Sequence, residues 1–238
     1  MSERVWYSRA LVQSLEQSLI SAFKSEYVKL TPKPANPGAG FHVRLANGTR
    51  QARRDDNVQQ DVTEIIVPNC SYSTFYFGFI AAFAIGPTIK KHYLKDASIS
   101  IFQDILGDLA PFFRAEWHEE AASDERCKHA QPHWHFVQRP RRIERIVKLR
   151  QSEHIISFAE ERESELFSGL ADCGGFHFAM TSQWDTQDAP PYKNKLLFDS
   201  DAVFLKWFAG LTRYIAGQIA YMLETMPGKG RAFEFTGG

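Results

Sequence analysis

The chain has 238 residues, 44% of them apolar, and it carries 28 acidic and 28 basic residues. This length allows one large domain or two small ones. A formal net charge of zero excludes a global attraction to nucleic acid or to an anionic membrane, so any such binding must be local. The three cysteines are odd in number and widely spaced, which excludes a disulfide framework. Because the first residues also lack the pattern of a signal peptide, we expect a cytoplasmic protein.

The first third of the chain predicts one helix followed by strands and polar loops. Residues 8–29 have apolar side chains every four residues, which predicts an amphipathic helix with Ser8 as its N-cap. The Pro- and Gly-rich segment 31–40 predicts a loop. We expect short strands where apolar residues alternate or cluster, and a polar loop between them; the strands are 41–45 and 62–67, and the loop is 50–61.

The most apolar stretch is residues 72–89. A helix needs about 20 apolar residues to cross a bilayer, and this run is shorter and is interrupted by Gly78 and by Gly86-Pro87. We therefore expect a buried core element and no membrane partner. Residues 99–109 then predict a helix.

The last third of the chain predicts helices separated by a loop. A basic helix is expected at 139–150, a helix with an acidic outer side at 153–170, and a Pro-containing loop at 183–195. The clearest prediction is a C-terminal helix from Ser200 to Met226, with a buried stripe of Phe204, Phe208, Leu211, Ile215, Ile219 and Met222. Taken together, these elements predict a single α+β domain over residues 1–238, with a mixed or mainly antiparallel sheet and amphipathic helices at both ends.

Four of the eight histidines lie within a short polar stretch that begins after Phe113. Side chains alternate between the two faces of a strand, so strands on either side of a polar loop at 119–131 would separate apolar from polar residues. If the two strands pair as a hairpin, Trp117 and Trp134 share the buried face. The opposite face then carries Glu116, His118, His133 and His135.

This predicted polar face has the composition of a catalytic or metal-binding site. We expect His133, His135 and Glu116 to be the catalytic residues, with the imidazoles acting as acid and base. The same groups suit a divalent metal such as zinc or manganese, with His133 and His135 as ligands and His118 or Glu116 as the third. Without a metal, no other cofactor is expected. The alternative is a polar sheet face that carries solvated histidines.

Residues 131–135, with the sequence QPHWH, resemble the His-x-His segment of the histidine-triad nucleotide hydrolases and transferases. In that family the segment is a strand that binds phosphate and supplies a nucleophilic histidine. The resemblance covers five residues, and Val137 stands where the family has a third His or a Gln. It does not assign the family, but it implies that a histidine pair on a strand can act on phosphates.

Arginines near the histidines predict phosphate binding, because the planar guanidinium suits phosphate oxygens. The predicted phosphate-binding residues are Arg114, Arg139, Arg141, Arg142 and Arg145. For the last four, a solvated face that pairs with the acidic helix is the competing interpretation.

Two functions remain open at this point. The first is a hydrolase of phosphodiesters, a nuclease or a nucleotide hydrolase, whose partner is nucleic acid or a nucleotide phosphate. The second is a non-catalytic binding protein or accessory subunit of a multi-protein bacterial complex, whose partner is another protein. No phosphate-binding loop, dinucleotide fingerprint, Gly-x-Ser-x-Gly or His-Glu-x-x-His motif is present in the sequence, which argues against ATPases, Rossmann dehydrogenases, α/β-hydrolases and zinc proteases.

Overall fold

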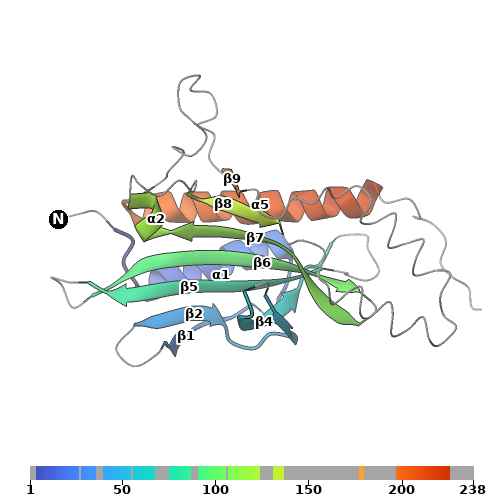
Figure 1. Cartoon of the computed structure of the whole chain (residues 1–238), viewed down its shortest axis with the longest axis horizontal. Coiled ribbons are helices and arrows are strands. Elements are labelled where there is room, and N and C mark those ends of the chain that lie inside the picture. Colours follow the sequence, from blue (N-terminus) through green and yellow to red (C-terminus); the bar gives the residue numbers. More distant parts are fainter. Residues whose placement is uncertain are drawn as a thin grey trace, which may run out of the picture.

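The strands form an open antiparallel sheet in the order β1-β2-β5-β6-β7-β8-β9 (Figure 1). The structure is a computed structural model that describes residues 4–26, 28–35, 40–54, 56–67, 75–86, 91–105, 107–123, 131–136, 177–179 and 197–225. All pairings among the described strands are antiparallel, which confirms the expected antiparallel sheet. The strands are β1 (Leu30–Pro34), β2 (Phe41–Leu45), β3 (Arg50–Arg53), β4 (Gln59–Glu64), β5 (Phe75–Ile85), β6 (His92–Ile105), β7 (Asp108–His118), β8 (His133–Phe136) and β9 (His177–Ala179).

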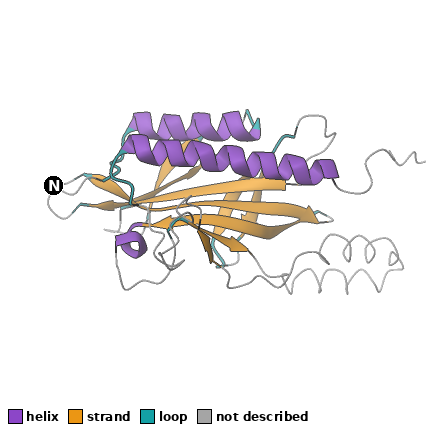
Figure 2. Ribbon diagram, turned by 90° about the horizontal axis from the view of Figure 1, so that it is seen from above, coloured by secondary structure: helices purple, strands orange, loops and turns teal. Residues whose placement is uncertain are grey.

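Two helices cover one face of this sheet (Figure 2). They are α1 (Arg9–Phe23) and α5 (Asp201–Thr225); a short helix, α2 (Glu119–Ser123), follows β7. Phe23 of α1 packs on Phe77 with ring centroids 4.4 Å apart, and Phe208 of α5 packs on Phe79 at 5.3 Å. The main core therefore lies between the two helices and the face of the sheet that carries Phe77 and Phe79.

Local sequence explains where these helices begin. The Leu11 amide donates to Ser8 Oγ at 3.0 Å, so Ser8 is the N-cap of α1 as predicted. The predicted C-terminal helix is confirmed as α5, and the amide of Val203 donates to Ser200 Oγ. Its predicted stripe is buried at Phe204, Phe208, Leu211, Ile215 and Ile219. None of the helices in the described residues is long and apolar enough to span a membrane.

The strands β3 and β4 form an arm, residues 50–64, on the face opposite the helices. β4 pairs with β5 at Phe77 and Tyr76, on the same edge of β5 that β2 occupies further along. β3 pairs with β4 and contacts β7, although β5 and β6 separate these strands in the sheet. The β3–β4 arm consequently lies across the face of the sheet and covers part of it (Figure 1).

Several predicted elements were wrong. Residues 99–109 are not a helix, because Ile99 and Ile101 alternate with Ser98 and Ser100 in β6, which pairs on both sides with β5 and β7. Pro32 and Pro34 lie in β1 rather than in a loop, since an edge strand tolerates residues without an amide hydrogen. The expected loops at 50–61 and 119–131 contain β3, part of β4, and α2.

Other predictions are confirmed or lie outside the described residues. The run at 72–89 contains β5, whose residues Phe75, Phe77, Phe79 and Phe83 are each at most 1% exposed. The expected helices at 139–150 and 153–170 and the loop at 183–195 lie outside the described residues. The single-domain organisation stays a prediction.

Candidate metal and catalytic site

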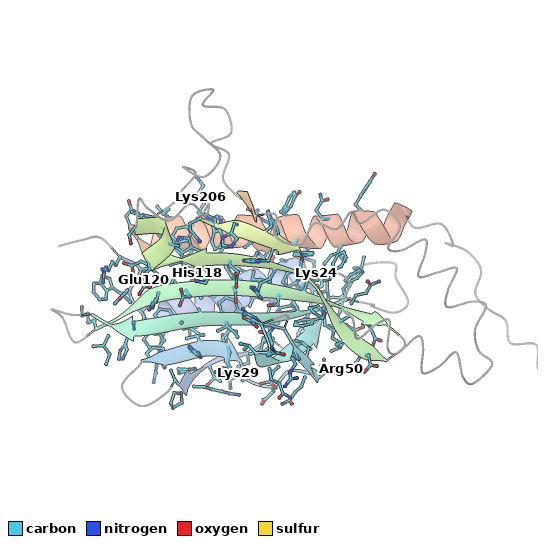
Figure 3. The ribbon with its side chains drawn as sticks, viewed as in Figure 1. Lys24, Lys29, Arg50, His118, Glu120 and Lys206 are labelled. Atoms are coloured by element: carbon cyan, nitrogen blue, oxygen red, sulfur yellow. The ribbon has the colours of Figure 1, made fainter. Side chains whose placement is uncertain are left out.

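The predicted hairpin forms between β7 and β8. Glu116 is opposite His133, and Arg114 is opposite His135. Trp117 is buried on the helix side of the sheet, where its ring contacts Phe198, and Trp134 contacts Tyr214 of α5. Because neighbouring residues in a strand face opposite ways, the histidines and Glu116 lie on the face away from the helices, as predicted. Figure 3 shows this face, with His118 over the central strands.

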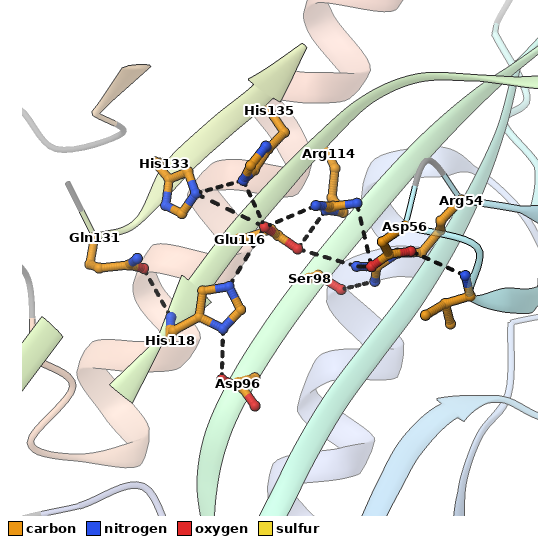
Figure 4. Close-up of polar contacts among 11 residues, drawn as sticks. Arg54, Asp56, Asp96, Ser98, Arg114, Glu116, His118, Gln131, His133 and His135 are labelled. Carbon is orange, nitrogen blue, oxygen red and sulfur yellow. Dashed lines mark hydrogen bonds and ion pairs between the residues drawn. The ribbon is translucent and has the colours of Figure 1, made fainter. Parts of the chain in front are cut away.

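Glu116 is the centre of the polar cluster (Figure 4). Its side chain is 6% exposed, and its two carboxylate oxygens have different sets of neighbours. Oε1 lies 2.5 Å from Arg114 Nε in an ion pair and accepts a hydrogen bond from Arg54 Nη2 at 3.3 Å. Oε2 lies 3.0 Å from His135 Nε2, 3.6 Å from His118 Nε2 and 4.0 Å from His133 Nε2. Oε1 therefore faces arginines, whereas Oε2 faces the three histidines and also accepts from Arg114 Nη2 at 3.3 Å.

The histidine side of Glu116 could hold a metal ion. One ligand atom each from Glu116, His133 and His135 lies within 4.8 Å of the others. The two Nε2 atoms are 2.9 Å apart, and their distances to Glu116 Oε2 are 3.0 and 4.0 Å. These separations bracket the roughly 3.4 Å expected between tetrahedral ligands that each lie about 2.1 Å from zinc. Two imidazole lone pairs at 2.9 Å also repel unless a proton or a cation lies between them.

His118 lies beside this group rather than inside it. Its Nδ1 is 2.7 Å from Asp96 Oδ1, and its backbone amide donates to the side chain of the buried Gln131 at 2.9 Å. A carboxylate on one ring nitrogen fixes the orientation of the ring and directs the other nitrogen toward the site. Of the two predicted third ligands, Glu116 is thus the one that shares the compact group with His133 and His135.

The surroundings stabilise Glu116 as an anion and His118 as a cation. Burial by itself raises the pKa of Glu116, but hydrogen bonds from His118 and His135 and the charge of Arg114 hold it well below its usual range. Burial by itself lowers the pKa of His118, but hydrogen bonds to Asp96 and Glu116 raise it to about 9. In the metal-free site, the carboxylate is therefore ionised and His118 is protonated at neutral pH.

Sequence reasoning missed the contribution of the β3–β4 arm. Arg54 follows β3 and donates to Ser98 Oγ at 2.9 Å and to Glu116, and its side chain is 9% exposed. Asp56 holds this guanidinium through both carboxylate oxygens and lies 3.7 Å from Arg114 Nη1. Nothing in the local sequence around Arg54 indicates this contact across the sheet. The alternation of Asp96, Ser98 and Ser100 with apolar residues would have placed Asp96 and Ser98 on this face, had the segment been interpreted as a strand.

Only some of the other candidate residues lie within the described part of the chain. His177 lies in β9, opposite His135 in the strand register. The predicted phosphate-binding residues other than Arg114 lie outside the described residues; they are Arg139, Arg141, Arg142 and Arg145. Arg114 itself is part of the site.

Comparison with known proteins adds no relative. The chain matches no protein-family model, no curated protein and no solved structure.

The Asp96–His118 pair gives the metal-free protein a pH-dependent stability. Because the pKa of His118 is raised in the folded state, the pair's contribution is fully present below about pH 6.5 and is lost as the pH rises through about 9. We expect Asp96→Asn to lower the free energy of unfolding most at pH 6 and progressively less toward pH 10. Urea denaturation in the presence of a chelator measures this difference.

Asp104→Asn is the matched control for this prediction. Asp104 lies on the same strand as Asp96 and pairs with an arginine, Arg50, rather than with a histidine. The cost of Asp104→Asn should thus be constant over this range. A cost of Asp96→Asn that is equally constant would contradict the role assigned to His118.

Proposed function

We propose that this chain is a metal-dependent hydrolase of phosphodiesters, acting on nucleotides or nucleic acid. The observation that carries the proposal is the convergence of Glu116, His133 and His135, whose ligand atoms lie within 4.8 Å of one another beside buried arginines. Two histidines and one carboxylate are the ligands of several catalytic zinc sites, which leave a further position open for water or substrate. Zinc or manganese would be held by these three residues.

The chemistry of the site suits a phosphate ester. A bound divalent ion polarises a phosphoryl oxygen and lowers the pKa of its bound water. The cations of the site are Arg54, Arg114 and His118, and all three contact Glu116. Guanidinium and imidazolium groups donate hydrogen bonds to the oxygens of a phosphodiester and balance the negative charge that gathers there in the transition state. His118 keeps its Nδ1 on Asp96, so its Nε2 is the atom that would contact the substrate.

A chromogenic phosphodiester, bis(p-nitrophenyl) phosphate, tests this proposal with the purified full chain and added zinc or manganese. We expect metal-dependent release of nitrophenol that falls at least about 10²-fold in His135→Ala, since a lost ligand opens the coordination shell. His42→Ala, which removes a histidine from β2, should keep its activity. If the wild-type chain with bound metal releases no nitrophenol, and cleaves neither RNA nor DNA, the proposal fails. The binding or accessory role then remains as the alternative.

A further inference from the structure

A buried amide lies on the same face of the sheet as the metal site, beneath the β3–β4 arm. Gln60 is 4% exposed, and neither its Oε1 nor its Nε2 has a hydrogen-bond partner within the described part of the chain. The amide lies directly over Gly78 of β5. A Cβ at Gly78 would come within 2.5 Å of Gln60 Cδ and Nε2, so only a glycine leaves room for the amide there.

The next residue across the sheet repeats this pattern. Ser100 of β6 is opposite Gly78, is 3% exposed, and its Oγ also lacks a partner among the residues the structure describes. Directly opposed residues have Cβ atoms about 5 Å apart, so the Gln60 amide and the Ser100 side chain are neighbours. Arg114 is in turn opposite Ser100 on β7. A row of polar groups therefore leads from Gln60 to the cations of the proposed hydrolytic site.

The buried amide is not required by its immediate surroundings. Ala52 and Val62 of the arm form a small apolar cluster with Phe102 of β6, and Ala52 is opposite Gln60 in the strand register. A leucine would satisfy such an environment, whereas a buried donor and acceptor without partners destabilise the fold. A ligand that pairs with both atoms of the amide accounts for the polar side chain at this position.

We propose that Gln60 and Ser100 form a nucleobase-binding subsite of the enzyme, an inference that rests on the proposed phosphodiesterase function. A primary amide presents one acceptor and two donors in a plane, and glutamine pairs with the edge of a base through adjacent donor and acceptor atoms. Adjacent strands are about 4.8 Å apart, which puts Gly78 roughly 10 Å from the backbone of Arg114, two strands away. A nucleotide with its base at Gln60 therefore directs its phosphate toward Arg114 and the metal ligands.

Isothermal titration calorimetry tests the subsite with the metal-loaded full chain, the four common ribonucleoside 5′-monophosphates and ribose 5-phosphate, which has no base. We expect at least one nucleotide to bind about 10- to 100-fold more tightly than ribose 5-phosphate. Gln60→Leu should remove most of this preference and leave the affinity for ribose 5-phosphate unchanged. Ser100→Ala should reduce the preference less, and it provides the test if Gln60→Leu does not fold. Gln51→Leu, an exposed position on the same arm, is the control and should bind like the wild type.

The outcomes separate the subsite from the proposed function. Equal affinity of the wild type for all five ligands, or no binding of any of them, overturns the subsite. A preference that survives in both Gln60→Leu and Ser100→Ala also overturns it. If the wild type still binds metal and hydrolyses the diester in these cases, the proposed function stands. Loss of metal binding and hydrolysis in the wild type itself would refute the proposed function instead.

Discussion

Replacing both His133 and His135 by alanine is expected to abolish metal binding. The wild type should retain zinc or manganese after purification or after loading and desalting. The double variant leaves Glu116 as the single remaining member of the three-residue group, and one carboxylate that is already paired with arginines does not hold a divalent ion. Elemental mass spectrometry should therefore show a change from about one ion per chain to about none.

A matched control removes two histidines elsewhere on the sheet. His42 lies on β2 and His92 at the start of β6, and neither belongs to the group that could hold a metal. His42→Ala combined with His92→Ala should keep the full metal content. A wild-type chain that retains no metal under loading conditions, or a double His133/His135 variant that still binds one ion, would refute the site.

Glu116→Ala is expected to destabilise the metal-free protein by about 3–5 kcal/mol, the usual cost of removing one partner from a buried ion pair. The side chains of Arg54 and Arg114 are 9% and 8% exposed, and Glu116 accepts from both. Without it, the longer contact of Arg114 to Asp56, at 3.7 Å, does not replace the lost ion pair. The free energy of unfolding from urea denaturation at pH 7, with a chelator present, measures the loss.

Two further variants show whether this loss comes from the buried charge. Glu120→Ala removes a carboxylate whose side chain is 75% exposed and pairs with Lys95, so it should cost less than about 1 kcal/mol. Glu116→Leu combined with Arg114→Met removes both partners and should recover much of the stability that Glu116→Ala loses. A cost of Glu116→Ala similar to that of Glu120→Ala would show that the network contributes little.

Short-range patterns were sufficient for part of this structure. The four-residue spacing of apolar side chains and the Ser caps predicted both ends of α5 and the start of α1. The predicted helix at 8–29 was too long, because α1 ends at Phe23, where Lys24 adopts a left-handed conformation. The two-residue alternation around Trp117 and Trp134 predicted which residues share each face if the two strands pair, and β7 does pair with β8. These features depend on neighbours within a few residues, or on one hairpin, so the information lies in the local sequence.

Other elements depend on partners that are distant in the sequence. Residues 99–109 carry apolar side chains at spacings that fit a helix. Most of them form a strand instead, because β6 pairs with β5 on one side and with β7 on the other. The polar residues 50–61 gave no indication of strands, although the strand predicted at 62–67 overlaps the end of β4. The arm carries few apolar residues, and they pack on Phe102 of β6, which is distant in the sequence.

Side-chain alternation along two neighbouring strands is a local property, so the amino-acid pattern alone was enough to predict that Glu116, His118, His133 and His135 share the polar face of a hairpin. The contacts of Arg54 and Asp56 with this cluster, and the burial of Gln60 over Gly78, are long-range features that appear only in the folded chain. These contacts arise where the β3–β4 arm lies across β5 and β6 toward β7. The path of the arm depends on how the whole sheet pairs and packs, and the residues around Arg54 carry no periodic signal of it.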